Sequence, residues 1–219
     1  FQRIYARFLS ADNLWLAGDL QVNTFSSNSQ VNPVVATLGN SNVVVAWASF
    51  NQAASTSLQD VYAQVLSPTG QKVGSEFQVN QYISYNQRAP AIAALSDGRF
   101  VVVWVSEQQR SLDSSDNTIG LYGTASVDVY ARIFTASGAP AGNEFLVSTN
   151  FNICSSPQVA AAAGGAFRVV WAEKGRTGGT NGWDILGTTF SSAGLGGPAR
   201  VINTTRFGDQ YLPRISWDG

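Results

Sequence analysis

The sequence predicts an all-β fold, a β-propeller of four-stranded antiparallel blades, and three observations lead to this fold class. Short apolar segments rich in Val, Ile, Phe and Tyr, each bounded by turn residues, recur along the chain of 219 residues. This pattern is typical of strands and not of helices. The segments return in groups of four, and each group begins at a proline. The strands of a sandwich do not repeat in fours, so we favour a propeller, with a solenoid of stacked hairpins as the alternative.

Each strand of the repeat has its own marker. The first strand follows Pro33, Pro90, Pro157 or Pro213, and successive prolines are 57, 67 and 56 residues apart. The second strand carries Trp47, Trp104 or Trp171, which we expect to pack between blades. The third strand contains Tyr-Ala-Arg or a related motif at 4–7, 61–64, 129–132 and, in decayed form, 185–188. The fourth strand lies at 20–23, 77–80, 145–148 and 200–203.

These markers divide the chain into blades. The predicted units are a partial blade at 1–32, blades at 33–89, 90–156 and 157–212, and a lone first strand at 213–219. The chain thus holds about three and three-quarter blades, which is an incomplete ring with unpaired strand edges. We therefore expect that the polypeptide continues past Gly219 with a Val-rich, Trp-bearing strand, or that another chain supplies this strand. The chain starts at Phe1 and contains no Met, so we interpret it as processed or excised.

The composition excludes several classes of function. The 13 basic and 14 acidic residues give a net charge of −1, so no nucleic-acid footprint is present and no nucleic-acid partner is expected. The longest apolar runs are strand-length, far shorter than the roughly 20 residues that span a bilayer. The chain has no His and one Cys, which excludes histidine-dependent catalysis, histidine metal sites and an internal disulfide framework.

The long connections all fall on one rim of the predicted propeller. Successive antiparallel strands alternate in direction, so the connections after the second strand and between blades share an edge, which we call the loop rim. They are 24–32, 51–59, 81–89, 107–127, 149–156, 174–183 and 204–211. Binding residues concentrate on long loops held by a rigid scaffold. We expect any ligand on this rim or at the mouth of the axis.

Five residues on this rim are candidate ligand contacts. The indole of Trp183 is predicted to stack on a sugar ring, although such a side chain can also pack under its own loop. The other candidates are Asp184, Glu107, Asp113 and Asp116. The last two lie in the 107–127 loop, whose oxygen-rich side chains either hold calcium or form a solvated polar loop. No other cofactor is expected.

Two further features have competing interpretations. An aspartate directly precedes three of the third strands: Asp60, Asp128 and Asp184. These aspartates form either a ring of ligands or, as we favour, hydrogen bonds within turns. Asn203-Thr204-Thr205 is a sequon, so Asn203 is a candidate for N-glycosylation.

The sequence offers one arrangement of residues for catalysis, a pair of glutamates. Glu107 and Glu173 both lie near the loop-rim ends of second strands and offer a two-carboxylate glycosidase pair. Glu107 is three residues after Trp104, whereas Glu173 is two residues after Trp171, so the two positions are not equivalent. We therefore predict a protein that is not an enzyme.

Two stretches carry a resemblance to known repeats. The run at 128–138, continued at 142–145, and the run at 90–104 resemble the repeats of large secreted bacterial surface proteins of adhesin-like type. The resemblance covers nearly the whole chain and implies a propeller-like scaffold and a secreted or cell-surface location. It carries over no functional residues.

The sequence leads to three hypotheses of function. The first is a secreted, non-catalytic module that binds carbohydrate or mediates adhesion, with a glycan or a cell-surface protein as partner. The second is a structural repeat subunit of an extracellular assembly or filament. The third is a propeller glycoside hydrolase, which requires paired carboxylates.

Overall fold

The computed structural model describes residues 1–16, 18–111, 125–175 and 182–217 and confirms the predicted fold class. Three antiparallel sheets of four strands and one pair of strands make up the described fold. The only helical segment in the described residues is a short 3-10 turn, Ala163–Gly165. None of the described helical structure has the length and hydropathy needed to span a bilayer.

Each four-stranded sheet is one blade, with its strands in chain order. Blade 1 consists of β3 (Gln30–Thr37), β4 (Val43–Phe50), β5 (Gln59–Leu66) and β6 (Lys72–Gln78). Blade 2 consists of β7 (Gln87–Ala94), β8 (Phe100–Ser111), β9 (Ala125–Phe134) and β10 (Phe145–Leu146). Blade 3 consists of β11 (Ile153–Ala161), β12 (Phe167–Lys174), β13 (Asp184–Phe190) and β14 (Arg200–Val201). The partial blade is the pair β1 (Tyr5–Ala6) and β2 (Leu20–Gln21).

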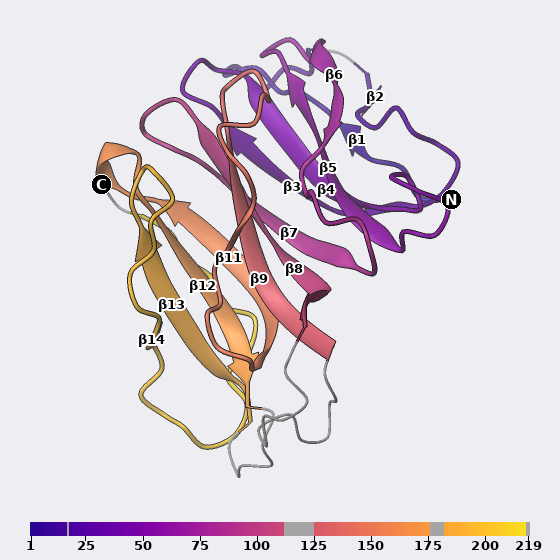
Figure 1. The fold of residues 1–219 in the computed structure, drawn as a ribbon. Helices are drawn as coiled ribbons and strands as arrows, with labels where there is room; N and C mark the ends of the chain where they lie inside the picture. The colour runs from indigo at the N-terminus through magenta and orange to yellow at the C-terminus, as the bar shows by residue number, and fades with distance from the viewer. Residues whose placement is uncertain (17, 112–124, 176–181, 218–219) are drawn as a thin grey trace.

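The blades stand side by side in a row, which we call the fan (Figure 1). The first strands of neighbouring blades, β3, β7 and β11, contact one another and form the inner edge. The core lies between the blades, in three clusters of buried side chains, one at each blade–blade interface. The predicted interblade tryptophans Trp47, Trp104 and Trp171 are all fully buried. The amino and carboxyl termini lie at opposite ends of the fan (Figure 1).

The inner strands share a bulge that the sequence analysis did not predict. Pairing slips by one residue at the proline of each inner strand, and the residue before the proline has a positive φ. These residues are Asn32 (54°), Ala89 (52°), Ser156 (51°) and, before Pro213, Leu212 (54°). Proline has no N–H for the ladder, so a bulge is where a sheet tolerates it. The left-handed conformation is strained for these residues, and a bulge of this kind changes the direction of the side chains beside it.

Residues 213–217 differ from the prediction of a lone first strand. This segment forms no strand among the described residues, because no second strand lies beside it to complete a ladder. It is held instead by side chains, including the guanidinium of Arg168, which lies 4.8 Å from the centre of the Trp217 ring. The complete inner strands, in contrast, begin at Gln30, Gln87 and Ile153, slightly before the predicted boundaries.

A ladder of phenylalanines joins successive blades. The ring of Phe77 lies 5.4 Å from that of Phe134 in the next blade, and Phe145 lies 5.5 Å from Phe190 in the same way. The phenylalanine also covers a turn glycine: a Cβ on Gly138 would lie 2.6 Å from the Phe77 ring. Only glycine allows both the positive φ of this turn and the close contact with the neighbouring blade.

Gly138→Ala tests this contact against Gly98→Ala as a matched control. Both glycines have a φ of +87°, but a Cβ at Gly98 meets no atom within 4 Å. The left-handed backbone costs each variant about 1–2 kcal/mol, and overpacking against Phe77 adds about 1–3 kcal/mol at Gly138 alone. Urea denaturation should therefore show a larger loss for Gly138→Ala. Equal losses would show that the Phe77 contact is not tight.

Candidate functional site

The loop-rim ends of β8 and β12 each carry a glutamate, and the two side chains start on sheet faces that pack together. Side chains alternate along a strand, so Glu107 lies on the same face of blade 2 as Val103. By the same alternation, Glu173 lies on the same face of blade 3 as Trp171. Val103 and Trp171 belong to one buried cluster between the two blades. Glu107 and Glu173 therefore border the same interblade space at the loop rim.

Glu173 is a buried carboxylate surrounded by nitrogen donors. Only 6% of the residue is exposed. The side-chain amides of Asn150 and Asn152 donate to its Oε1 at 2.5 and 2.8 Å, and the Trp171 indole donates to Oε2 at 2.9 Å. Burying a carboxyl group is costly unless its oxygens are hydrogen-bonded. Here three donors from two elements fix both oxygens.

A departure from the repeat places Glu173 at this position. The equivalent residues of blades 1 and 2, also two positions after the tryptophan, are the buried serines Ser49 and Ser106. A glutamate that replaces a buried serine is the sequence signal of this site. The unequal positions of Glu107 and Glu173 are evident from the sequence, whereas the exchange of a buried serine for Glu173 was missed.

The change is coupled to a second one on the inner strand. In blade 2 the Trp104 indole donates to Gln87 Oε1 at 3.3 Å. Blade 3 has Cys154 in place of this glutamine, and the Trp171 indole donates to Glu173 instead. Burial and the neighbouring carboxylate raise the pKa of the Cys154 thiol far above its usual range. Cys154 therefore packs beside the site as a small buried side chain and is not a nucleophile.

Glu107 is held from the inner strand. Arg88 Nε donates to Glu107 Oε1 at 2.7 Å, and the Asn86 amide donates to Oε2 at 2.8 Å. Arg88 directly precedes the left-handed Ala89, so the bulge of β7 sets the direction of its side chain. The Glu107 side chain is 22% exposed, so this carboxylate, unlike Glu173, is open to solvent.

An arginine connects the site to the third strand of blade 2. Arg110 donates to the fully buried Asp128 through Nη2 at 2.5 Å and Nε at 2.9 Å. It also donates to the backbone carbonyl of Asn150, the residue whose amide holds Glu173. Burial alone would lower the pKa of Arg110, but its bonds with Asp128 outweigh burial and raise it. Asp128, Arg110, Asn150 and Glu173 thus form one continuous network.

An aromatic corner lies on the same rim of blade 3. The ring of Trp183 meets the ring of Tyr211 edge-on, with centroids 5.0 Å apart. The hydroxyl of Tyr211 shares a hydrogen bond with Ser155 on the inner strand β11. Tyr211 is 44% exposed, whereas Trp183 is half-buried. The predicted sugar contact Trp183 therefore packs against Tyr211 and is not an isolated aromatic ring.

Asp184 and Asn203 are close together and bond to each other. The Asn203 amide donates to Asp184 Oδ1 at 2.6 Å, and Arg206 lies 3.6 Å from the other oxygen. Asn203 Oδ1 also accepts the backbone N–H of Ile185 at 2.7 Å, just as Asn80 accepts that of Val61. Both side chains thus tie the third strand to the fourth. Glycosylation of Asn203 stays a prediction.

Asp113 and Asp116, the predicted calcium ligands, lie outside the described residues. Within the described ranges, no group of three or more acidic, Cys or His side chains is placed to hold a metal ion. The calcium site therefore stays a prediction as well.

The fold is similar to that of known propeller glycoside hydrolases. The GH93 α-L-arabinofuranosidase of Fusarium graminearum, solved with arabinobiose, matches with a TM-score of 0.57 and 13% identity, over 96% of this chain and 56% of its own. An endo-arabinase from Bacteroides thetaiotaomicron matches with a TM-score of 0.51 and 14% identity, over 87% of this chain and 69% of its own. A thermostable family-43 glycoside hydrolase matches with a TM-score of 0.51 and 11% identity, over 84% and 57%. No protein-family model and no curated protein sequence matches the chain. The chain spans little more than half the length of the first of these structures.

These neighbours correct two predictions from the sequence. We predicted a non-catalytic binding module, or a structural subunit, and no enzymatic activity; the similar structures are instead glycoside hydrolases. The prediction rested on the missing histidine and on the unequal positions of Glu107 and Glu173 relative to their tryptophans, but two carboxyl groups need not occupy equivalent strand positions to act together. Glycoside hydrolysis uses two carboxyl groups and needs no histidine.

Asp60 is the counterpart of Asp128 and Asp184 in blade 1, but among the described residues no arginine pairs with it. It is fully buried, and its Oδ2 has no hydrogen-bond partner among the described atoms. Burial raises the pKa of Asp60, although hydrogen bonds from Asn80 and Ser57 oppose the shift. Blade 1 therefore holds an incompletely satisfied carboxyl group at the position where blades 2 and 3 form ion pairs.

Asp60→Asn tests this assignment through the pH dependence of stability. The folded state holds the Asp60 proton more tightly than the unfolded state, whose pKa is about 3.9. The wild type therefore loses stability as the pH rises from about 4 through the raised pKa of the folded state, whereas an asparagine does not titrate. Urea denaturation at a series of pH values should show the stability of Asp60→Asn rising relative to wild type across that window. A difference that stays constant with pH would contradict the raised pKa.

Proposed function

We propose that this chain is part of a glycoside hydrolase that cleaves arabinose-containing glycans at the loop rim between blades 2 and 3. The observation that carries the proposal is the position of Glu107 and Glu173 on facing sheets that border one space. The likeness to propeller hydrolases, one of them bound to arabinobiose, supports the reaction class and the sugar.

The two carboxyl groups have different surroundings, and these suggest different roles. Glycosidases use one carboxyl group to protonate the leaving oxygen and a second to attack the sugar or to activate water. Such roles are set by environment. Glu173 is buried, and three N–H donors fix the direction of its carboxyl group; in this proposal it takes the role that Glu107 leaves open. Glu107 is partly exposed and has Arg88 beside it, which is the setting of a nucleophile or base.

The aromatic corner gives the proposed substrate a place to bind. Trp183 and Tyr211 present ring surface on the loop rim, next to Ser155 of the inner strand. Sugar rings offer C–H groups for an aromatic face and hydroxyls for polar side chains. In this proposal Trp183 remains the sugar contact expected from the sequence. Secretion and kinship with bacterial surface repeats also remain predictions.

Glu107→Gln and Glu173→Gln test the proposal directly. General acid–base catalysis contributes about 10²–10⁴-fold, so each variant should lower kcat on arabinobiose or arabinan by at least about 100-fold. Reducing-sugar release measures the rate, and circular dichroism confirms that each variant is folded. Asp19→Asn is the control, because Asp19 lies away from the loop rim with a 72% exposed side chain, and it should keep full activity.

Two outcomes would contradict the proposal. One is the absence of sugar release by the wild-type chain above the level of a no-protein blank. The other is activity in both glutamine variants equal to that of Asp19→Asn. A loss in one variant only would assign catalysis to that carboxylate and would overturn the proposed pair.

A further inference from the structure

A single side chain holds the turn that follows each fourth strand. In the partial blade and in blades 1 and 3 this side chain is an asparagine two residues after the strand, and its amide donates at 2.7–2.9 Å to the backbone carbonyl two residues later. These asparagines are Asn23, Asn80 and Asn203. In blades 1 and 3 the same amide also donates to the aspartate at the start of the third strand, at 2.8 Å to Asp60 and 2.6 Å to Asp184. One amide therefore ties the turn to the sheet.

Blade 2 has Ser148 at this position, and arginine takes the place of the amide. A hydroxyl has one proton, which Ser148 donates to Asp128 Oδ1 at 3.4 Å, so none is left for the carbonyl of Asn150. Arg110 donates to Asp128 through Nη2 at 2.5 Å and Nε at 2.9 Å, and Nη2 also donates to the carbonyl of Asn150, two residues after Ser148. The guanidinium therefore makes the same two bonds that the asparagine amide makes in blades 1 and 3.

The two changes occur together. The position of blade 1 that corresponds to Arg110, counted from the buried tryptophan, is Ala53. Blade 1 thus combines asparagine with alanine, whereas blade 2 combines serine with arginine. The connection is also shorter by one residue: Pro157 comes nine positions after Ser148, and the proline of every other copy comes ten positions after its asparagine. The turn between blades 2 and 3 is therefore a distinct variant of the repeat.

The replacement changes which part of the molecule holds the turn. An asparagine holds the turn from the strand that leads into it, but Arg110 holds it from β8, three residues after Glu107. The turn itself carries Asn150 and Asn152, whose amides donate to Glu173 Oε1 at 2.5 and 2.8 Å. A short chain of bonds thus joins the strand of one glutamate to the donors of the other.

The surroundings of Arg110 favour a guanidinium over an ammonium group. The Arg110 side chain is 19% exposed and that of Asp128 is 1% exposed, and the guanidinium carbon lies 4.8 Å from the centre of the Phe151 ring. A guanidinium presents several N–H groups in one fixed plane and stacks on an aromatic ring, whereas the ammonium of lysine is a compact point charge. The change Arg110→Lys therefore keeps a charge beside Asp128 but loses the simultaneous hold on Asn150.

We propose that Arg110 is a positioning residue that fixes the carboxyl group of Glu173 relative to that of Glu107. The distance between the two carboxyl groups decides how a glycosidase acts, and Arg110 connects the elements that carry this pair. The role in catalysis rests on the proposed function, whereas the hold on Glu173 exists without a substrate and is measured separately.

The thiol of Cys154 reports whether the turn is held. Cys154 is the one cysteine of the chain, it is 1% exposed, and its Sγ lies 3.8 Å from the backbone carbonyl oxygen of Asn152. Release of the turn should therefore expose the thiol through local opening. Arg110→Lys should react with the thiol reagent DTNB at least about tenfold faster than wild type, since a hydrogen bond from a charged group is lost.

Arg99→Lys is the matched control for this measurement. Arg99 also donates to an aspartate, Asp97, and to a backbone carbonyl of the next blade, that of Ser192, but it lies on the rim opposite to the loop rim. Arg99→Lys should therefore react with DTNB at the wild-type rate. Circular dichroism of each variant shows whether a faster reaction comes from unfolding of the whole chain.

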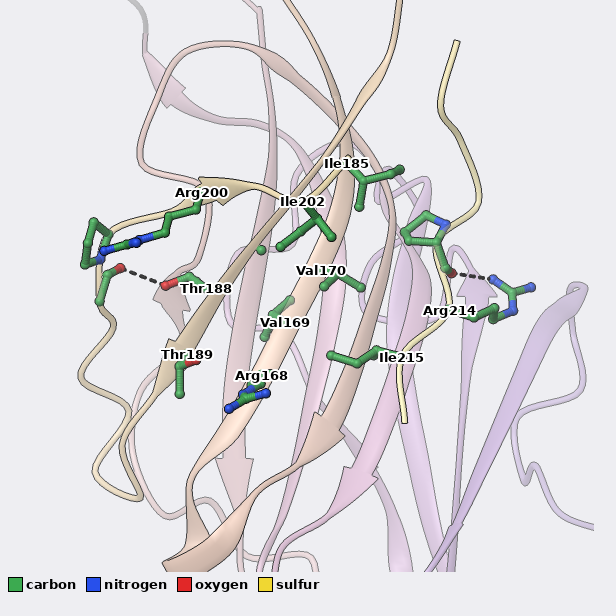
Figure 2. Close-up of a pocket in the computed structure, with 14 residues that line it drawn as sticks. Arg168, Val169, Val170, Ile185, Thr188, Thr189, Arg200, Ile202, Arg214 and Ile215 are labelled. Carbon is green, nitrogen blue, oxygen red and sulfur yellow. Dashed lines mark hydrogen bonds between the residues drawn. The ribbon is translucent and has the colours of Figure 1, made fainter. Parts of the chain in front are cut away.

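A second control lies on the other face of blade 3. Val170 alternates with Trp171 along β12, so its side chain points away from Glu173 and into a groove of about 510 Å³, where Figure 2 shows it beside Ile202. Ile202 is 58% exposed. Ile202→Ala should also react at the wild-type rate, because the groove is separate from the turn.

The Trp171 indole gives a second readout, since it donates to Glu173 Oε2 at 2.9 Å. Its N–H signal in a nitrogen–proton correlation spectrum is identified by its loss in Trp171→Phe. The signal should shift in Arg110→Lys and stay in place in Arg99→Lys. Such a shift reports on the bond to Glu173 and not on the stability of the chain.

Hydrolysis of arabinan then tests the positioning role. Arg110→Lys should lower kcat about 10–100-fold, because misplacing a reacting group is costly, and should leave KM nearly unchanged, because Arg110 acts through Asn150 and not on the substrate. A wild-type rate of labelling together with an unshifted Trp171 signal would overturn the inference, whatever the activity. So would an unchanged kcat in a variant whose turn has opened. If the wild-type chain releases no sugar, the proposed function fails, and the labelling and the spectrum still decide whether Arg110 fixes Glu173.

Discussion

The structure depends on one constraint, that a four-stranded blade has two apolar faces and must cover both. A single sheet cannot bury either face by itself, so each blade is stabilised by its neighbours. This is why the core consists of three clusters between blades. The buried tryptophans and the phenylalanine ladder belong to these interfaces.

The candidate site arises where one interface departs from the repeat. A repeat that places serine at a buried position can hold a carboxylate there only if new donors accompany it. Glu173 has these donors in Asn150, Asn152 and the Trp171 indole. The indole is free to donate because Cys154 replaces the glutamine of blade 2. The site is therefore a coordinated set of substitutions on an otherwise regular scaffold.

Much of the fold could be predicted from the sequence, because the period, the prolines and the tryptophans are local signals. The absence of the expected first strand at 213–217 could not be predicted from the sequence, since a strand needs a partner that the local sequence does not specify. Glu107 and Glu173 were visible as a pair, but their facing positions follow from strand register, which only the three-dimensional pairing defines. The prediction of a non-enzyme had a different weakness: it dismissed Glu107 and Glu173 because their positions in the repeat differ, although carboxylate chemistry depends on the distance between two carboxyl groups and not on equivalent positions.

The strained bulges belong to the repeated scaffold and are not themselves a mark of the functional site. Strain often marks a functional position, yet a left-handed residue precedes the proline in all four copies, including blade 1, where the preceding side chain is Val31. The bulge is therefore a feature of the fold, and in each blade one residue directly precedes its left-handed position. Chemistry enters through the residue placed there, which is Arg88 in blade 2 and Ser155 in blade 3. Because Arg88 binds Glu107 and Ser155 binds Tyr211, the same backbone feature supports both the carboxylate and the aromatic part of the site.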